Sequence, residues 1–233
     1  MERKKKKPAP NPVKAARFAR ESRAAKKKRT LEIIARLHRE YPDAKCSLTF
    51  RNPFQLLVAT ILSAQCTDER VNQVTPTLFK RFPKPQDMAD ARPEELEEII
   101  KSTGFFRNKT KSLLGMSAAV AELHKGKVPD EMDAIVDLPG VGRKTANVVL
   151  GNAFGKSEGV VVDTHVTRLS QRLGLTGQTD AVKIELDLME LVPREEWTVI
   201  SHLFIDHGRA ICKAPTPRCE VCFLNDICPS SRV

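Results

Sequence analysis

Long apolar runs are missing from the 233-residue sequence. No stretch has the apolar region of a signal peptide, and none is long enough to cross a bilayer. Hydrophobic residues still make up 41% of the chain, which is enough for a real core in one large domain or two modest ones. We therefore expect a folded cytoplasmic protein with no membrane partner.

The body of the chain also lacks an excess of positive charge, although the formal net charge is +10. Residues 1–29 hold 13 Lys or Arg and two Glu, whereas 26 basic residues face 27 acidic ones from Thr30 onward. A uniformly basic body is therefore excluded. Segment 1–29 is predicted to be a disordered basic tail, because it has few apolar residues. The tail could bind nucleic-acid phosphates independently of the base sequence, or it could simply make the protein more soluble. Charge alone does not distinguish these two roles.

Strand signals are almost absent, since only Val160–Val162 is strand-like. Apolar periodicity, caps and helix-ending glycines predict an all-α fold. We see no internal repeat. The predicted helices cover 30–41, 53–65, a segment capped by Thr67 or Asp68, 93–103, 108–125, 130–136, 143–154, a segment capped by Asp163 that ends at 173, a segment capped by Thr179 or Asp180 that ends at 191, and 195–211.

The segment Leu138–Ala146 (LPGVGRKTA) places a glycine turn and an amine together. Gly140 and Gly142 form a tight hairpin between two predicted helices, and glycine allows a backbone to approach a ligand closely. The start of the second helix can hold a phosphate oxygen whatever the base sequence. This combination points to chemistry on DNA, although a lysine beside such a hairpin is often only a phosphate contact.

Four cysteines fall within 17 residues, at Cys212, Cys219, Cys222 and Cys228. Disulfides are disfavoured, because the chain shows no export signal and pairs across such short loops would be strained. Structural zinc and a [4Fe–4S] cluster both accept four cysteines, and ligand identity leaves these two open. Cys46 and Cys66 lie far away in sequence and are expected to be buried thiols.

From about Thr30 to Pro229 the chain resembles endonuclease III, a bifunctional DNA glycosylase of the helix-hairpin-helix superfamily. The resemblance rests on residues 61–68 (ILSAQCTD), 138–150, 161–165 (VVDTH), 207–209 (HGR) and the cysteine spacing. It implies a six-helix barrel at 46–156 that contains the helix-hairpin-helix. It also implies a second helical domain, formed by 30–45 and 157–233, with DNA in the cleft between the domains. The cysteine spacing then favours a [4Fe–4S] cluster over zinc.

The resemblance makes Lys144 the nucleophile and Asp163 the catalytic carboxylate. A lysine has a pKa of about 10.4, and nucleophilicity at neutral pH asks for roughly 7 to 8, a difference of about 4 kcal/mol. The helix start and a closed lesion pocket would both disfavour the ammonium form of Lys144. Asp163 is within reach of Lys144 along the chain, and it would handle protons and stabilise positive charge on the sugar. It is also a plausible helix cap.

Other positions are expected to contact the nucleic acid. The resemblance places Gln65 and Phe105 where they fill the gap left by a flipped nucleotide. The family often has leucine at the second position, so phenylalanine leaves the lesion preference open. Candidate phosphate contacts, apart from the hairpin glycines Gly140 and Gly142, are Lys109, Thr164, His165, Arg209, Lys213 and Arg218; each could instead be an ordinary surface residue. His165 is expected to be a hydrogen-bonded support.

The resulting hypothesis is a monomeric base-excision enzyme of the bacterial nucleoid. It would remove oxidised pyrimidines from damaged double-stranded DNA and cleave the abasic site by β-elimination through Lys144. One alternative is a monofunctional mismatch glycosylase of the same superfamily, which would generally lack an amine at this position. A second alternative is a non-enzymatic DNA-binding protein whose cluster has a structural or electron-transfer role.

Overall fold

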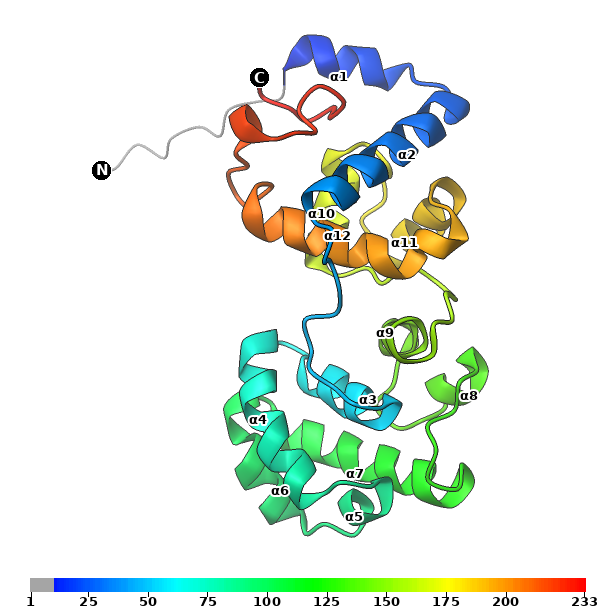
Figure 1. The fold of residues 1–233 in the computed structure, drawn as a ribbon, viewed down its shortest axis with the longest axis vertical. Coiled ribbons are helices and arrows are strands. Elements are labelled where there is room, and N and C mark those ends of the chain that lie inside the picture. The colour runs from blue at the N-terminus through cyan, green and yellow to red at the C-terminus, as the bar shows by residue number, and fades with distance from the viewer. Residues whose placement is uncertain (1–10) are drawn as a thin grey trace, which may run out of the picture. The chain divides into compact units, whose positions relative to one another are not determined.

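The computed structural model describes residues 11–233, and the regular structure in this range is entirely helical (Figure 1). The prediction of an all-α fold is confirmed. The strand-like expectation for Val160–Val162 was wrong, because this segment is irregular. The Val161 carbonyl accepts a hydrogen bond from the Ser201 hydroxyl at 2.9 Å, where a strand would use a backbone ladder.

The chain divides into two compact units. Cys46–Glu158 forms one of them, which we call the hairpin unit, and Gly159–Val233 joins the chain before Cys46 in the other, which we call the cysteine unit. The hairpin unit therefore ends two residues later than the barrel boundary expected from the sequence.

The hairpin unit consists of helices joined by short turns. Sequence signals define α9 over its whole length. Of the two caps expected for α4, Thr67 and Asp68, the structure uses Thr67, whose hydroxyl accepts the Arg70 N–H at 3.3 Å. The short helix α5 is not predicted. The helices are α3 (Pro53–Leu62), α4 (Asp68–Arg81), α5 (Pro85–Ala89), α6 (Pro93–Ile100) with the following 3₁₀ turn η1 (Lys101–Thr103), α7 (Phe106–Leu123), α8 (Met132–Val136) and α9 (Arg143–Phe154).

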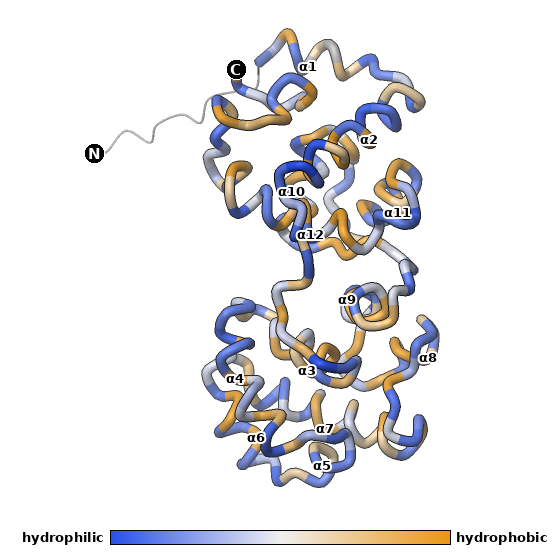
Figure 2. The backbone as a smooth tube through the Cα atoms, in the orientation of Figure 1, coloured by the Kyte–Doolittle hydropathy of each residue, from blue (hydrophilic) through white to orange (hydrophobic). Residues whose placement is uncertain are grey.

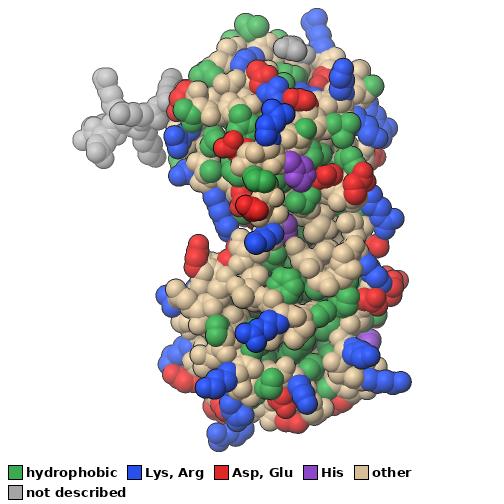
Figure 3. All heavy atoms as spheres, in the orientation of Figure 1, with side chains coloured by type: hydrophobic (Ala, Val, Ile, Leu, Met, Phe, Trp, Pro, Cys, Tyr) green, Lys and Arg blue, Asp and Glu red, His purple; other side chains and the backbone are tan. Residues whose placement is uncertain are grey.

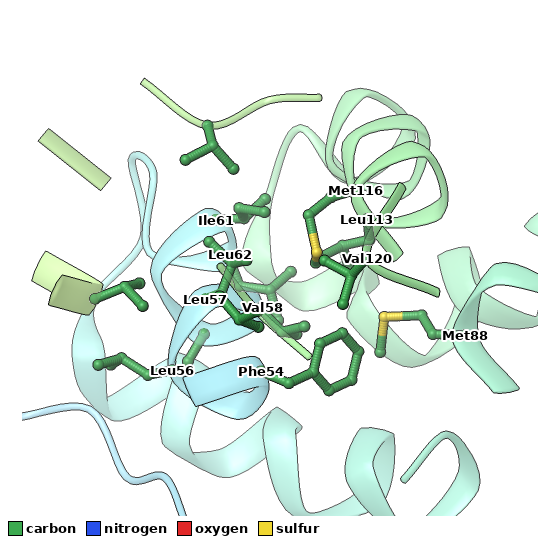
Figure 4. Packing of buried hydrophobic residues seen from close by; sticks show 14 of the residues in the cluster. Phe54, Leu56, Leu57, Val58, Ile61, Leu62, Met88, Leu113, Met116 and Val120 are labelled. Atoms are coloured by element: carbon green, nitrogen blue, oxygen red, sulfur yellow. The ribbon is translucent and has the colours of Figure 1, made fainter. Parts of the chain in front are cut away.

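Helix α3 is the centre of the hairpin unit's core. Its sequence is apolar almost all round, and it packs against α4, α7 and α9 (Figures 2 and 4). Figure 4 shows Phe54, Leu57 and Val58 of α3 facing Met88 of α5 and Met116 of α7. Each such side chain contributes about 1.5–3 kcal/mol when it is fully buried. This packing gives the hairpin between α8 and α9 a rigid support.

The cysteine unit has its own apolar core, formed by α2, α10, α11 and α12. Asp180 caps α11 as expected, since its carboxylate accepts the Lys183 N–H at 3.0 Å. The elements are α1 (Pro12–Ala19), α2 (Arg23–Glu40), α10 (Thr164–Arg172), α11 (Ala181–Leu191), η2 (Arg194–Glu196), α12 (Trp197–Ala210) and η3 (Cys219–Val221).

The prediction of a disordered tail over 1–29 was wrong for residues 11–29; residues 1–10 lie outside the described range. Asn11 caps α1 and Ser22 caps α2, which begins seven residues before the expected start. Arg29 is buried, forms an ion pair with Glu21 at 2.7 Å and lies over the ring of Phe18. The segment is ordered because specific partners compensate for its charge.

Positive and negative side chains are interspersed on the face of both units shown in Figure 3. This agrees with the nearly balanced charge after residue 29. Within residues 11–233, no helix is both long and apolar enough to span a membrane.

Candidate active site and cysteine loop

The hairpin between α8 and α9 is anchored by buried apolar residues. Leu138 and Val141 are buried, and the Val141 N–H donates to the Leu138 carbonyl at 3.0 Å. Gly140 has a φ of +77°, and a Cβ at this position would lie 2.6 Å from the Cβ of Ser112 on α7. Glycine is therefore required both by the backbone conformation and by the close approach of α7. The tight turn expected from the sequence is present.

Helix α9 begins directly after this turn, with Gly142 as a cap that has no side chain. A helix start of this kind is a ready anion site, because the amide groups and the helix dipole both favour negative charge. Lys144 is the second residue of α9 and is exposed to solvent. The turn thus presents an exposed amine next to an anion site.

Asp163 is the cap of α10. Its Oδ1 accepts the Val166 N–H at 2.8 Å, which confirms the predicted capping role. The side chain is half-buried. A carboxylate has about four lone-pair sites, so the cap orients the group and leaves it able to accept further hydrogen bonds.

The turn of α10 that follows Asp163 packs closely on α12 through Gly208. A Cβ on Gly208 would lie 2.7 Å from Arg168 Nη2 and 2.8 Å from His165 Nδ1. The Arg168 guanidinium donates to His165 Nδ1 at 3.1 Å and to the Gly208 carbonyl at 3.2 Å. His165 is therefore hydrogen-bonded, as expected of a supporting residue. The arginine was not singled out from the sequence, although it follows His165 by one helical turn.

Gln65 and Phe105 are both exposed, and both have a left-handed backbone. Their φ angles are +53° and +47°, and 61% of the Phe105 surface is accessible. Non-glycine residues seldom adopt this conformation, and it persists only where the surroundings impose it. Each residue lies in a sharp turn just after a helix end, Gln65 after α3 and Phe105 after η1.

Lys109 is the one predicted phosphate contact that the structure contradicts. Its side chain is buried, with 5% of the residue accessible, and Nζ donates to the carbonyls of Leu62 at 2.8 Å and Thr103 at 2.7 Å. These backbone carbonyls occupy two of the three ammonium donors, and burial keeps the ammonium away from a phosphate. Burial lowers the pKa of Lys109, and the nearby Cys66 opposes that shift.

The remaining predicted contacts lie on the surface of the cysteine unit. All four are exposed, so their side chains are accessible to a ligand. They are Thr164, Arg209, Lys213 and Arg218.

The segment Cys212–Cys228, which we call the cysteine loop, brings its four thiols to one pocket. The Arg218 N–H donates to the Ile211 carbonyl at 3.1 Å, which closes the first part of the loop on the end of α12. The Cys222 N–H donates to the Cys219 carbonyl at 3.2 Å. None of these four cysteines is paired in a disulfide in the described part of the chain.

Buried and cationic groups surround these thiols. Burial raises the pKa of Cys222 to about 11 and that of Cys228 to about 12. The Arg172 guanidinium lies 3.3 Å from the Cys212 sulfur and also donates to the Lys213 carbonyl at 2.9 Å. His207 Nε2 lies 3.5 Å from the Cys222 sulfur. Such thiols require a bound cation or a metal group to become thiolates.

Within the described residues, no three His, Cys, Asp or Glu side chains are arranged to hold one metal ion. The four cysteines line a shared pocket. Soft thiolate donors spread around a pocket fit a multi-iron cluster, whose ligands bind separate iron atoms. Cys46 and Cys66 are half-buried and pack against the core of the hairpin unit.

Comparison with known proteins identifies the family. The sequence profile of the HhH-GPD superfamily of base excision DNA repair proteins matches residues 58–194. Endonuclease III of Synechocystis sp. is 55% identical over 209 residues, covering 90% of this chain and 95% of its own. That of Bacillus subtilis is 49% identical over 189 residues, covering 81% and 86%.

A solved structure of a trapped covalent endonuclease III–DNA intermediate matches with a TM-score of 0.83 and 42% identity. The match covers 88% of this chain and 97% of that one. The chain therefore belongs to the endonuclease III family of the HhH-GPD superfamily, the DNA glycosylases and abasic-site lyases of base excision repair.

Proposed function

We propose that this protein removes oxidised pyrimidines from damaged duplex DNA and then cuts the abasic strand through a Schiff base on Lys144. The observation that carries the proposal is the exposed Lys144 amine in the first turn of α9, directly after the glycine hairpin. A phosphate held by this turn would bring the neighbouring sugar to the amine, which is catalysis by positioning.

The Lys144 amine attacks the anomeric carbon of the damaged nucleotide. The glycosidic bond breaks, and the base leaves with the bonding electrons and takes up a proton. The sugar ring opens to give a Schiff base with Lys144, which acidifies the neighbouring C2′. Loss of a C2′ proton then expels the 3′ phosphate, so the strand is cut on the 3′ side.

We assign Asp163 to stabilisation of the positive charge that develops on the sugar and to proton transfer. The support for this role is its fixed orientation, because the bond from Val166 N–H holds Oδ1 at the start of α10. A carboxylate held in this way loses little conformational freedom when the substrate arrives.

We assign Gln65 and Phe105 to the gap left by the flipped nucleotide. Both are exposed at sharp turns of the hairpin unit, and an exposed phenylalanine ring is suited to insertion between base steps. Gln65 has the donors and acceptor to pair with the orphaned base. Phosphate contacts are assigned to the backbone at Gly140 and Gly142, and to Thr164, His165, Arg209, Lys213 and Arg218.

The endonuclease III family generally carries a [4Fe–4S] cluster. We propose that Cys212, Cys219, Cys222 and Cys228 hold it here, since they line one pocket. The cluster would form four iron–thiolate bonds, and these bonds would cross-link the cysteine loop. The residues between the first two cysteines, which include Lys213 and Arg218, would then be held in place against DNA. We propose that the enzyme acts as a monomer on DNA of the bacterial nucleoid.

Borohydride trapping tests the mechanism. Borohydride reduces the imine to an amine, so a Schiff-base enzyme becomes covalently linked to a duplex with a single oxidised pyrimidine. Wild type and Lys183→Ala, which alters an exposed lysine of α11, should be trapped, whereas Lys144→Ala should not. Base release by wild type without trapping would support the monofunctional alternative, and undiminished trapping of Lys144→Ala would refute the assigned nucleophile.

A further inference from the structure

Lys109 is a charged residue in the interior of the hairpin unit. It is the fourth residue of α7, and 5% of its surface is accessible. A buried ammonium is strongly destabilising unless it is compensated by hydrogen bonds. Two of its three donors bind backbone carbonyls, at 2.8 Å to Leu62 and 2.7 Å to Thr103. Such strong bonds to two separate segments join those segments through one side chain.

The two acceptors are the last residues of two helical segments, since Leu62 ends α3 and Thr103 ends η1. Carbonyl groups at a helix end have no partner within the helix, and a cation is the group that best satisfies them. The Lys109 ammonium therefore stabilises both ends at once, although they lie about 40 residues apart in the sequence.

The proposed gap-filling residues follow directly from these two ends. Gln65 is three residues beyond Leu62, and Phe105 is two residues beyond Thr103. An extended chain spans at most about 3.6 Å per residue, so the two lie within about 11 Å and about 7 Å of the carbonyls that Lys109 binds. Both have a positive φ, a conformation that depends on the surrounding structure. A shift of either carbonyl would therefore reach the side chain that follows it.

We propose that Lys109 is a positioning residue that fixes the separation of Gln65 and Phe105, so that both enter the duplex as one unit when the damaged nucleotide is flipped. The inference rests on the gap-filling function proposed above. Lys109 does not touch the DNA. It acts through the ends of α3 and η1, which carry the two residues that do.

The test uses Lys109→Met, which keeps the length of the side chain and removes its donors. Lys111→Met, on the exposed surface of the same helix, is the matched control. The ligand is a duplex with a stable abasic analogue opposite 2-aminopurine, whose fluorescence rises when the orphaned base is unstacked. Lys109→Met should bind this duplex about 10-fold to 100-fold more weakly and lose most of the fluorescence change, because small misplacements have effects of this order. Affinity for undamaged duplex should change by less than about twofold.

A second background separates positioning from a general loss of stability. The double variant Gln65→Ala/Phe105→Ala lacks both side chains that Lys109 is proposed to position. Adding Lys109→Met to it should therefore change the affinity for the abasic duplex by less than about twofold. An equal loss in both backgrounds would overturn the inference, because it would show a general structural role. Unchanged fluorescence in Lys109→Met would also overturn it.

The same measurements distinguish failure of this inference from failure of the gap-filling function. If Gln65→Ala/Phe105→Ala keeps the full fluorescence change, the gap-filling assignment is wrong, and the inference is lost with it. If the double variant loses the signal and Lys109→Met keeps it, only the inference is wrong. Should Lys109→Met fail to fold, Lys109→Gln is used instead. Because its neutral amide is a shorter and weaker donor than the ammonium, it should lose part of the fluorescence change, and an unchanged signal would overturn the inference.

Discussion

Replacing Arg29 with methionine tests why the N-terminal segment is ordered. The guanidinium of Arg29 binds Glu21 through two hydrogen bonds, at 2.9 Å and 2.7 Å. It also donates to the Leu173 carbonyl at 2.6 Å. The side chains of the ion pair are 6% and 9% accessible. Methionine keeps only the apolar stem of the arginine side chain and removes all of these donors.

The size of the effect follows from burial. Removing one partner of a buried ion pair costs about 3–5 kcal/mol, because the other charge stays buried without compensation. The Leu173 carbonyl also loses a donor, worth about 1 kcal/mol. We therefore expect Arg29→Met to lower the free energy of unfolding of the cysteine unit by about 4 kcal/mol. This is a large share of the stability of a typical domain.

Urea unfolding followed by circular dichroism measures this change, with a separate transition allowed for each unit. The matched control is Arg23→Met, since Arg23 makes a 2.9 Å ion pair with Glu190 whose side chains are 78% and 62% accessible. An exposed pair of this kind is worth about 0–1 kcal/mol. Adding Glu21→Gln to Arg29→Met should recover part of the loss by removing the stranded charge. If Arg29→Met lowers the free energy of unfolding no more than Arg23→Met does, burial of the ion pair does not stabilise the N-terminal segment.

Three further outcomes are expected. Asp163→Asn should keep the cap of α10 and lower base excision by about 10²–10⁴-fold, whereas Asp163→Ala should also lose about 1 kcal/mol in thermal unfolding; equal activity of Asp163→Asn and wild type would exclude the catalytic role. Gly140→Ala should destabilise the hairpin unit by about 1–3 kcal/mol, and Ser112→Gly should relieve the clash without removing the strain at positive φ; full relief in the double variant would contradict this account. Iron and sulfide assays should find about four of each per chain, and removing them should lower the melting temperature of the cysteine unit; stoichiometric zinc would contradict the cluster.

Local signals account for the parts of the fold that could be predicted. Helix α9 was bounded correctly because a glycine precedes it and another follows it. Asp163 was identified as a cap, and Thr67 and Asp180 were each one of two candidates, because a cap acts on an amide within three residues of itself. The strand expected at Val160–Val162 did not form, because three valines favour a strand only when a partner strand is present. The described part of the chain has no strand.

Long-range compensation explains what could not be predicted. The N-terminal segment is rich in charge, and composition does not reveal that Arg29 binds the Leu173 carbonyl, 144 residues away. In the sequence, Lys109 is likewise one basic residue among many. Nothing local shows that it binds the Leu62 carbonyl, which lies 47 residues away. The candidate site was accessible to sequence reasoning where the chemistry is local, as at Lys144 and its hairpin. The residues that support it are visible only in three dimensions.

Helix α10 links the cysteine loop to Asp163 within one packed element. Asp163 caps one end of the helix, and Arg168 and Arg172 both donate to the Cys212 carbonyl at 3.2 Å. The nine residues of α10 form a rod of about 13 Å. Disorder at Cys212 would therefore remove two hydrogen bonds from the helix whose first turn Asp163 caps.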